Sequence, residues 1–70
     1  MQQQISILVN GVKREVPEGE TVSQLLRRLE IASERVAVEL NKSIVRKRDW
    51  EQTAVLAGAE IEVVEFVGGG

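Results

Sequence analysis

The stretch ISILVNGVKREV, residues 5–16, predicts a β-hairpin near the start of the chain. Apolar side chains recur at every second position in its first half, which is the period of a strand with one buried face. The pair Asn10-Gly11 is a strong hairpin signal, because a tight two-residue turn needs positive φ at both positions. We therefore expect strands over residues 5–9 and 12–16.

A helix is predicted directly after this hairpin. Pro17 and Gly19 interrupt the strand pattern. Thr21, followed by Gln24 three residues later, is a capping-box signature. Apolar residues then recur at the spacing of one helix face, at Val22, Leu25, Leu26 and Leu29. The pattern predicts a helix of about ten residues that lays one apolar stripe on the sheet.

The second half of the chain returns to strands. Alternation predicts strands over residues 36–40, 44–45 and 61–67, the second of them very short. The stretch RDWEQTAVLAG between the last two is read as a turn of helix and a loop, with Trp50 and Leu56 tucked under the sheet. Trp50 is interpreted as a core residue rather than a platform for a ligand. The resulting order is the β-grasp arrangement, an α+β fold with a mixed sheet, one main helix and a short helical turn.

Composition excludes several classes of function. The 70 residues are 43% hydrophobic, which fits one small domain, and they include no cysteine and no histidine. Disulfides, the usual zinc sites and Ser-His or Cys-His nucleophile pairs are thereby excluded. The net charge of −2 argues against a nucleic-acid partner, and the basic run Arg46-Lys47-Arg48 is read as a solvated loop. The chain has neither the signal-peptide pattern nor a long apolar stretch, so we expect a cytoplasmic protein without membrane contact.

The chain closes on EFVGGG, residues 65–70. Glycine loses more conformational freedom on ordering than any other residue, so a glycine run does not hold a fold together. A frayed end is one interpretation, but a β-grasp pattern directly before the glycines favours a working end. We expect a β-grasp domain over residues 1–66 and a flexible tail over residues 67–70.

Four stretches carry a resemblance to a known family. They are VNG (9–11), VPEGETVSQLL (16–26), VAVELN (36–41) and LAGAEIEVVEFVGGG (56–70). Together they resemble the ThiS family, the ubiquitin-like sulfur carrier proteins of thiamine biosynthesis, over essentially the whole chain. Two turn positions depart from the family pattern, because Lys42 stands where glycine is common and Ala59 where aspartate is common.

The resemblance implies a carrier rather than an enzyme. An adenylating enzyme (ThiF-like) would use ATP to activate the C-terminal carboxylate of Gly70, which would then become a thiocarboxylate. The sulfur would come from a persulfide on another protein and pass to thiazole synthase (ThiG-like). The residues Val67, Gly68 and Gly69 would form the tail that reaches the partner. The chain would bind no cofactor and no metal of its own, and would be a monomer when free.

The tail alone is too weak a recognition element. Ordering its residues costs roughly 4–8 kcal/mol of backbone entropy, which would need about 300 Å² of buried apolar surface to offset it. Glycines supply no such surface, so we expect a docking patch of Leu8, Val64 and Phe66 on the sheet face opposite the helix. The alternative is that Val64 and Phe66 are ordinary sheet residues covered by the 46–58 loop. Glu60, Glu62 and Glu65 are read as a solvated face that could complement a basic partner.

Other functions compete with this interpretation. A carrier like the small subunit of molybdopterin synthase shares the fold and the Gly-Gly end. A modifier conjugated to lysines is a more distant possibility. A β-grasp interaction module of the RNA-binding or regulatory kind would need no free glycine terminus. Replacement of one oxygen by sulfur at the C-terminus distinguishes a carrier from a module.

Overall fold

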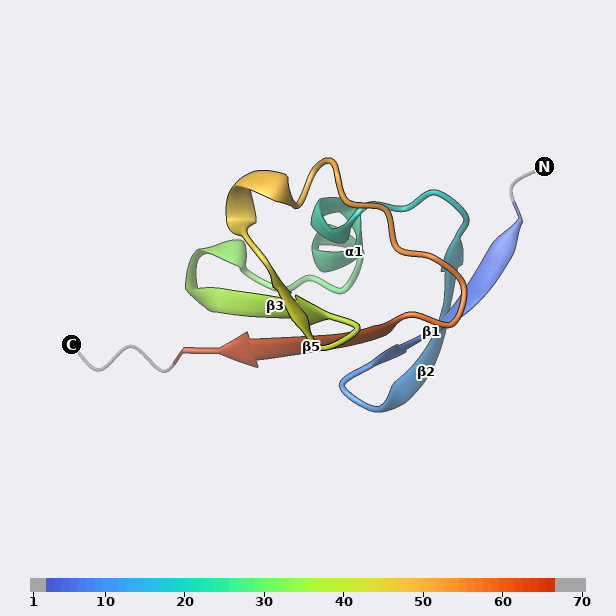
Figure 1. The fold of residues 1–70 in the computed structure, drawn as a ribbon, viewed down its shortest axis with the longest axis horizontal. Coiled ribbons are helices and arrows are strands. Elements are labelled where there is room, and N and C mark those ends of the chain that lie inside the picture. Colours follow the sequence, from blue (N-terminus) through green and yellow to red (C-terminus); the bar gives the residue numbers. More distant parts are fainter. Residues whose placement is uncertain (1–2, 67–70) are drawn as a thin grey trace.

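The computed structural model describes residues 3–66, which form a five-stranded mixed sheet crossed by one α-helix (Figure 1). Its elements are β1 (Gln4–Val9), β2 (Val12–Pro17), α1 (Val22–Arg28), the 3-10 turn η1 (Ser33–Arg35), β3 (Val36–Leu40), β4 (Ser43–Val45), the 3-10 turn η2 (Lys47–Asp49) and β5 (Glu60–Glu65). The strand order is β2-β1-β5-β3-β4, and β1 and β5 run parallel. The predicted α+β, β-grasp arrangement is confirmed. The tail expected over residues 67–70 lies outside the described residues.

The predicted hairpin forms around a tight turn. Val9 pairs with Val12, and the two turn residues between them, Asn10 and Gly11, have φ of 50° and 80°. These left-handed values are what a two-residue turn between strands requires. Glycine adopts them at no steric cost, and asparagine is among the few other residues that adopt them readily.

The helix begins at the predicted capping box. The N–H of Gln24 donates to the Thr21 hydroxyl at 3.1 Å, and the Thr21 N–H donates to the Gln24 side chain at 3.0 Å. The first two helical N–H groups are also satisfied, since Val22 donates to the carbonyl of Thr53 and Ser23 donates to the carbonyl of Trp50. The helix is shorter than predicted, because the chain turns left-handed at Glu30 (φ 58°) soon after α1 ends.

The core lies between α1 and one face of the sheet. Trp50 is buried there as predicted, and its indole N–H donates to the carbonyl of Val45 at 2.9 Å. The expectation that Leu56 is tucked under the sheet is wrong, since its side chain is 70% exposed. The N–H of Val55 donates to the carbonyl of Glu20 at 2.8 Å, and the Val55 side chain is buried while that of its neighbour Leu56 faces outward.

The turn between β3 and β4 forms although glycine is missing from it. Asn41 and Lys42 have φ of 51° and 72°, nearly the values of the Asn10-Gly11 turn. A side chain with a Cβ pays about 1–2 kcal/mol in this conformation. The departure at Lys42 therefore strains the turn without changing its geometry.

We expect Lys42→Gly to raise the free energy of unfolding by about 0.5–1 kcal/mol. The substitution removes the left-handed strain, and part of the gain is offset by the greater freedom of glycine in the unfolded chain. Denaturant melts measure the change. Lys42→Ala is the matched control, because it removes the charge but keeps the Cβ, and it should give no gain. A glycine variant no more stable than the wild type contradicts the strain.

Candidate functional site

The strand that leads towards the glycines lies in the middle of the sheet (Figure 1). β5 has β1 on one side and β3 on the other, and its pairing with β3 continues to Glu65. The N–H of Phe66 then donates to the carbonyl of Arg35 at 2.7 Å. The backbone is thus held to the body as far as the last described residue. The predicted sulfur acceptor and tail lie outside the described residues, namely Gly70, Val67, Gly68 and Gly69.

The predicted docking residues lie on the sheet face that is turned away from α1. Leu8, Val64 and Phe66 are 38%, 52% and 56% exposed, whereas Ile61 on the other face of β5 is buried. The connection that follows η2 runs on the same side of the sheet as α1 (Figure 1). This connection therefore leaves the three side chains uncovered.

The register of the strands separates these residues into two groups. Leu8 pairs with Glu60 at the beginning of β5, and Val64 pairs with Ala37 near its end. Val64 is four positions after Glu60 along the strand, which corresponds to a distance of about 13 Å at ~3.3 Å per residue. The structure therefore brings Val64 and Phe66 together at the tail end of the sheet, and Leu8 lies apart from them on the same face.

Carboxylates occupy the space between these two groups. Glu39 on β3 pairs directly with Glu62 on β5, and both line a shallow hollow together with Glu60, Lys42 and Val64. Like charges placed directly opposite each other on a sheet weaken the pairing. The sheet face turned away from α1, called the open face below, thus combines exposed apolar side chains with the carboxylates that lie between them. This combination suits a partner surface of positive charge.

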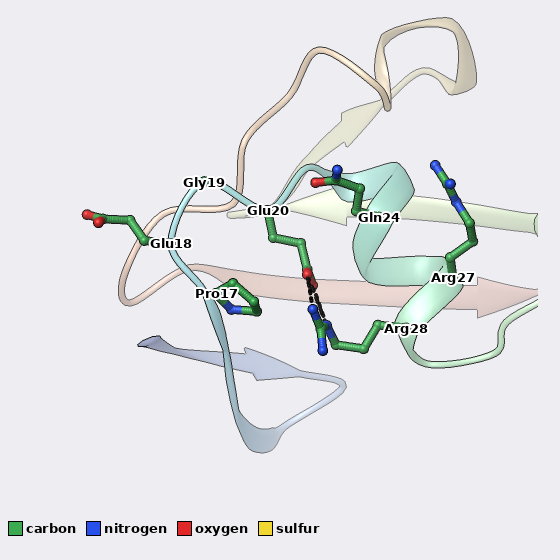
Figure 2. Close-up of a pocket in the computed structure, with 7 residues that line it drawn as sticks. All are labelled: Pro17, Glu18, Gly19, Glu20, Gln24, Arg27 and Arg28. Atoms are coloured by element: carbon green, nitrogen blue, oxygen red, sulfur yellow. Dashed lines mark hydrogen bonds and ion pairs between the residues drawn. The ribbon is translucent and has the colours of Figure 1, made fainter. Parts of the chain in front are cut away.

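A larger pocket of about 750 Å³ lies elsewhere, between the β2–α1 loop and the helix (Figure 2). Its buried carboxylate, Glu20, accepts hydrogen bonds from Arg28 Nε at 2.9 Å and Arg28 Nη2 at 2.7 Å. This bond raises the pKa of the Arg28 guanidinium. Figure 2 shows Arg27 extending away from the pair. The ion pair between Arg28 and Glu20 joins the helix to the β2–α1 loop, so the guanidinium of Arg28 is already occupied by a carboxylate of this chain.

Two kinds of site are not found among the described residues, a metal-binding cluster and a membrane-spanning helix. Within residues 3–66 there is no group of three or more metal-ligating side chains of the His, Cys, Asp or Glu type. In the same range, no helix has the length and apolar character needed to span a bilayer. The features that remain are the exposed sheet face and the strand that runs towards the glycines.

Sequence reasoning missed the side-chain contacts that hold this strand, one of which is made by Asn10. Asn10 was assigned a turn role only, yet its side chain hydrogen-bonds to the backbone of Val63 on β5. The two residues are 53 positions apart in the chain. No local pattern signals such a contact, since it depends on which strand lies beside β1.

Comparison with known proteins assigns a family to this arrangement. A family model described as the ThiS family matches residues 3–70. A solved structure of a thiamine biosynthesis protein (ThiS) from Geobacter metallireducens superimposes with a TM-score of 0.84 at 35% identity, covering 94% of this chain and 100% of that one.

Relatives of two different lengths match by sequence. A thiazole synthase from Paramagnetospirillum magneticum is 41% identical over 66 residues, which is 94% of this chain but 20% of that protein. The chain thus spans a fifth of that relative's length. The sulfur carrier protein ThiS of Escherichia coli is 30% identical over 66 residues, covering 94% of this chain and 100% of the relative.

Proposed function

The chain belongs to the ThiS family, and from this premise we propose that it is a sulfur carrier in thiamine biosynthesis and that the carboxylate of Gly70 is the group that carries the sulfur. A partner adenylating enzyme of the ThiF-like kind activates this carboxylate with ATP, releasing pyrophosphate. The persulfide of a donor protein then displaces AMP, and a thiol reductant frees the thiocarboxylate. Thiazole synthase (ThiG-like) receives the sulfur.

The observation that carries this proposal is the position of β5. A strand held on both edges by β1 and β3 is a rigid base, and the sequence that continues from it ends in Gly68, Gly69 and Gly70. A carboxylate at the end of side-chain-free residues meets no Cβ clash in a narrow active site. The four residues 67–70 reach at most about 13–14 Å from the body, at ~3.3–3.6 Å each.

The chemistry itself belongs to the partners in this proposal. The sequence has no cysteine to hold a persulfide and no histidine to act as a base near neutral pH. The chain therefore contributes a carboxylate and a docking surface, while ATP binds to the activating enzyme. We place the free carrier in the cytoplasm, because its proposed activation consumes ATP, and we propose that it is a monomer when free.

The choice of thiazole synthase as the enzyme that receives the sulfur is supported by the relatives that are much longer than this chain. A stretch similar to nearly the whole of this chain lies within proteins named thiazole synthase. A carrier and its acceptor joined in one polypeptide react at high effective concentration, which is a reason for such a joining. This observation favours thiazole synthase over a role like that of the molybdopterin synthase small subunit.

Docking is proposed to use the open face of the sheet. Val64 and Phe66 lie next to the point where residues 67–70 begin, so a partner that contacts them also receives the tail. Leu8 would be contacted separately by a partner broad enough to cross the carboxylates of Glu60 and Glu62. A patch that buries these apolar side chains offsets the entropy of ordering the glycines.

The proposal is tested by intact mass. The protein is incubated with ATP, a ThiF-like adenylating enzyme and a persulfide donor with a thiol reductant, and its mass should rise by the difference between sulfur and oxygen. A reaction without ATP is the control and should leave the mass unchanged. An unchanged mass in the complete reaction contradicts the carrier function and favours an interaction module.

A further inference from the structure

Two asparagines hold β5 from opposite edges. Asn10 and Asn41 are each the first residue of a tight turn, with φ of 50° and 51°. Each donates its own backbone N–H to a carbonyl of β5, Asn10 to Ile61 at 2.8 Å and Asn41 to Glu60 at 2.7 Å. Each also accepts a backbone N–H of β5 at its side-chain Oδ1. The left-handed turn thus leaves both side chains directed at the same strand.

The contact made by Asn10 extends the sheet towards the tail. The parallel pairing of β1 with β5 ends at Val9↔Ile61, where β1 enters its turn. The carboxamide of Asn10 then accepts the N–H of Val63 at 2.8 Å and donates to the carbonyl of Val63 at 3.4 Å. A carboxamide offers the same donor and acceptor as a peptide group. The Asn10 side chain therefore takes the place of the next β1 residue in hydrogen bonding to β5.

The contact made by Asn41 lies at the other end of β5. Its Oδ1 accepts the N–H of Glu60 at 2.9 Å, at the first residue of the strand. Glu60 is three positions before Val63 and further from the residues that carry the tail. The two asparagines are thus chemically alike and differ in how near they lie to Phe66.

We propose that Asn10 is a positioning residue for sulfur transfer, which fixes the direction in which the chain leaves the sheet after Phe66. Along the β1 edge of β5, within the described residues, its side chain is the one hydrogen-bond partner past Ile61. The β3 edge is held further, to Glu65 and to the bond between Phe66 and Arg35. Without the carboxamide, the end of β5 is held from a single edge.

Removal of the carboxamide is expected to misplace the terminal carboxylate in the partner's active site rather than to lower the affinity for the partner. This inference rests on the proposed function, because the tail must deliver a carboxylate to a fixed atom in the partner. A misplacement of about 1 Å at a reacting group can cost on the order of 100-fold in rate. Docking through the exposed face does not require that alignment, so the maximal rate should fall while the half-saturating concentration changes little.

The test compares three variants with the wild-type protein and the activating enzyme. Asn10→Gly keeps the left-handed turn but removes the carboxamide. Asn41→Gly makes the same change at the start of β5 and is the matched control. Asn10→Asp retains an acceptor for the N–H of Val63. The measurements are hydrogen exchange of the Val63 amide in the free protein, and kcat and KM for ATP-dependent activation of each variant.

We expect Asn10→Gly to lose protection at Val63 and about tenfold in kcat, with KM changed less than about twofold. Asn41→Gly should lose less than about twofold in kcat, and Asn10→Asp should stay within about twofold of the wild type. Equal losses of kcat in the two glycine variants overturn the positioning role, since they would report stability alone. Should Asn10→Gly fail to fold, a folded Asn10→Asp with protected Val63 but reduced kcat overturns the inference.

The experiment distinguishes failure of the proposed carrier function from failure of the inference about Asn10. Wild-type protein that is never activated removes the proposed function, whatever the variants do. The exchange of the Val63 amide is measured without any partner. If it is as slow in Asn10→Gly as in the wild type, Asn10 does not hold the end of β5, and the inference is wrong even when the carrier works.

Discussion

Deleting Gly70 is expected to abolish thiocarboxylate formation. The deletion moves the terminal carboxylate to Gly69, about 3.3–3.6 Å short of its place. Misplacement of a reacting group by about 1 Å can already cost on the order of 100-fold, so a full residue should leave no measurable product. Extending the chain by one residue beyond Gly70 should have the same effect, because the glycine carboxylate becomes a peptide carbonyl. Intact mass after the complete reaction measures both variants.

The fold provides the control for this result. The last described hydrogen bond along β5 is the one that Phe66 donates to Arg35, so removal of Gly70 withdraws no described contact. Denaturant melts of both variants should match the wild type. An added residue at the N-terminus, far in sequence from the reacting group, should leave sulfur uptake unchanged. Normal sulfur uptake by the C-terminally extended chain contradicts Gly70 as the acceptor.

Local patterns predicted most of the fold because the rules that decide these elements act over a few residues. The Asn10-Gly11 pair demands a tight turn wherever the hairpin lies, and the structure has both residues left-handed. Thr21 and Gln24 are close enough in sequence to satisfy each other, and both capping bonds form. Alternation along β5 correctly assigned Val64 to the exposed face of the sheet.

Features set by long-range register were not predictable in the same way. Alternation fixes the face on which Leu8 lies but not its neighbour, and the parallel register pairs it with Glu60 rather than with Val64. The bond from Asn10 to Val63 depends on the same register. Leu56 was misjudged because an apolar side chain in a loop follows the backbone anchors of that loop, here the bond from Val55 to Glu20.

The features of the candidate site likewise fall into those that the sequence predicts and those that depend on how the strands pair. An exposed aromatic at the end of a strand is visible in the sequence, so Phe66 was predicted from alternation, and Gly70 was predicted from the family resemblance that the terminal glycines help to carry. The facing pair Glu39 and Glu62 was not, because the strands that carry them are distant in sequence and meet only in the sheet. The negative charge on the proposed docking face is therefore a property of the fold rather than of any one segment.

Replacing Phe66 by alanine is expected to weaken binding to the activating enzyme by about 1–3 kcal/mol, or roughly 5- to 150-fold. Phe66 is 56% exposed and lies where the tail begins, so a partner that takes the tail is well placed to bury its ring. A buried phenylalanine would cost about 3–5 kcal/mol of folding stability on truncation. The exposure of Phe66 leads us to expect a far smaller change.

The matched control for Phe66→Ala is Leu56→Ala, because Leu56 is 70% exposed but belongs to the loop on the α1 side of the sheet. It should change neither binding nor stability appreciably, since an exposed side chain outside an interface contributes little to either. Binding titrations run beside denaturant melts separate the two effects. A folded Phe66→Ala variant that binds normally, or one that unfolds, contradicts the docking patch. Either result leaves the proposed chemistry of Gly70 intact, because the reactivity of a terminal carboxylate does not depend on which surface delivers it.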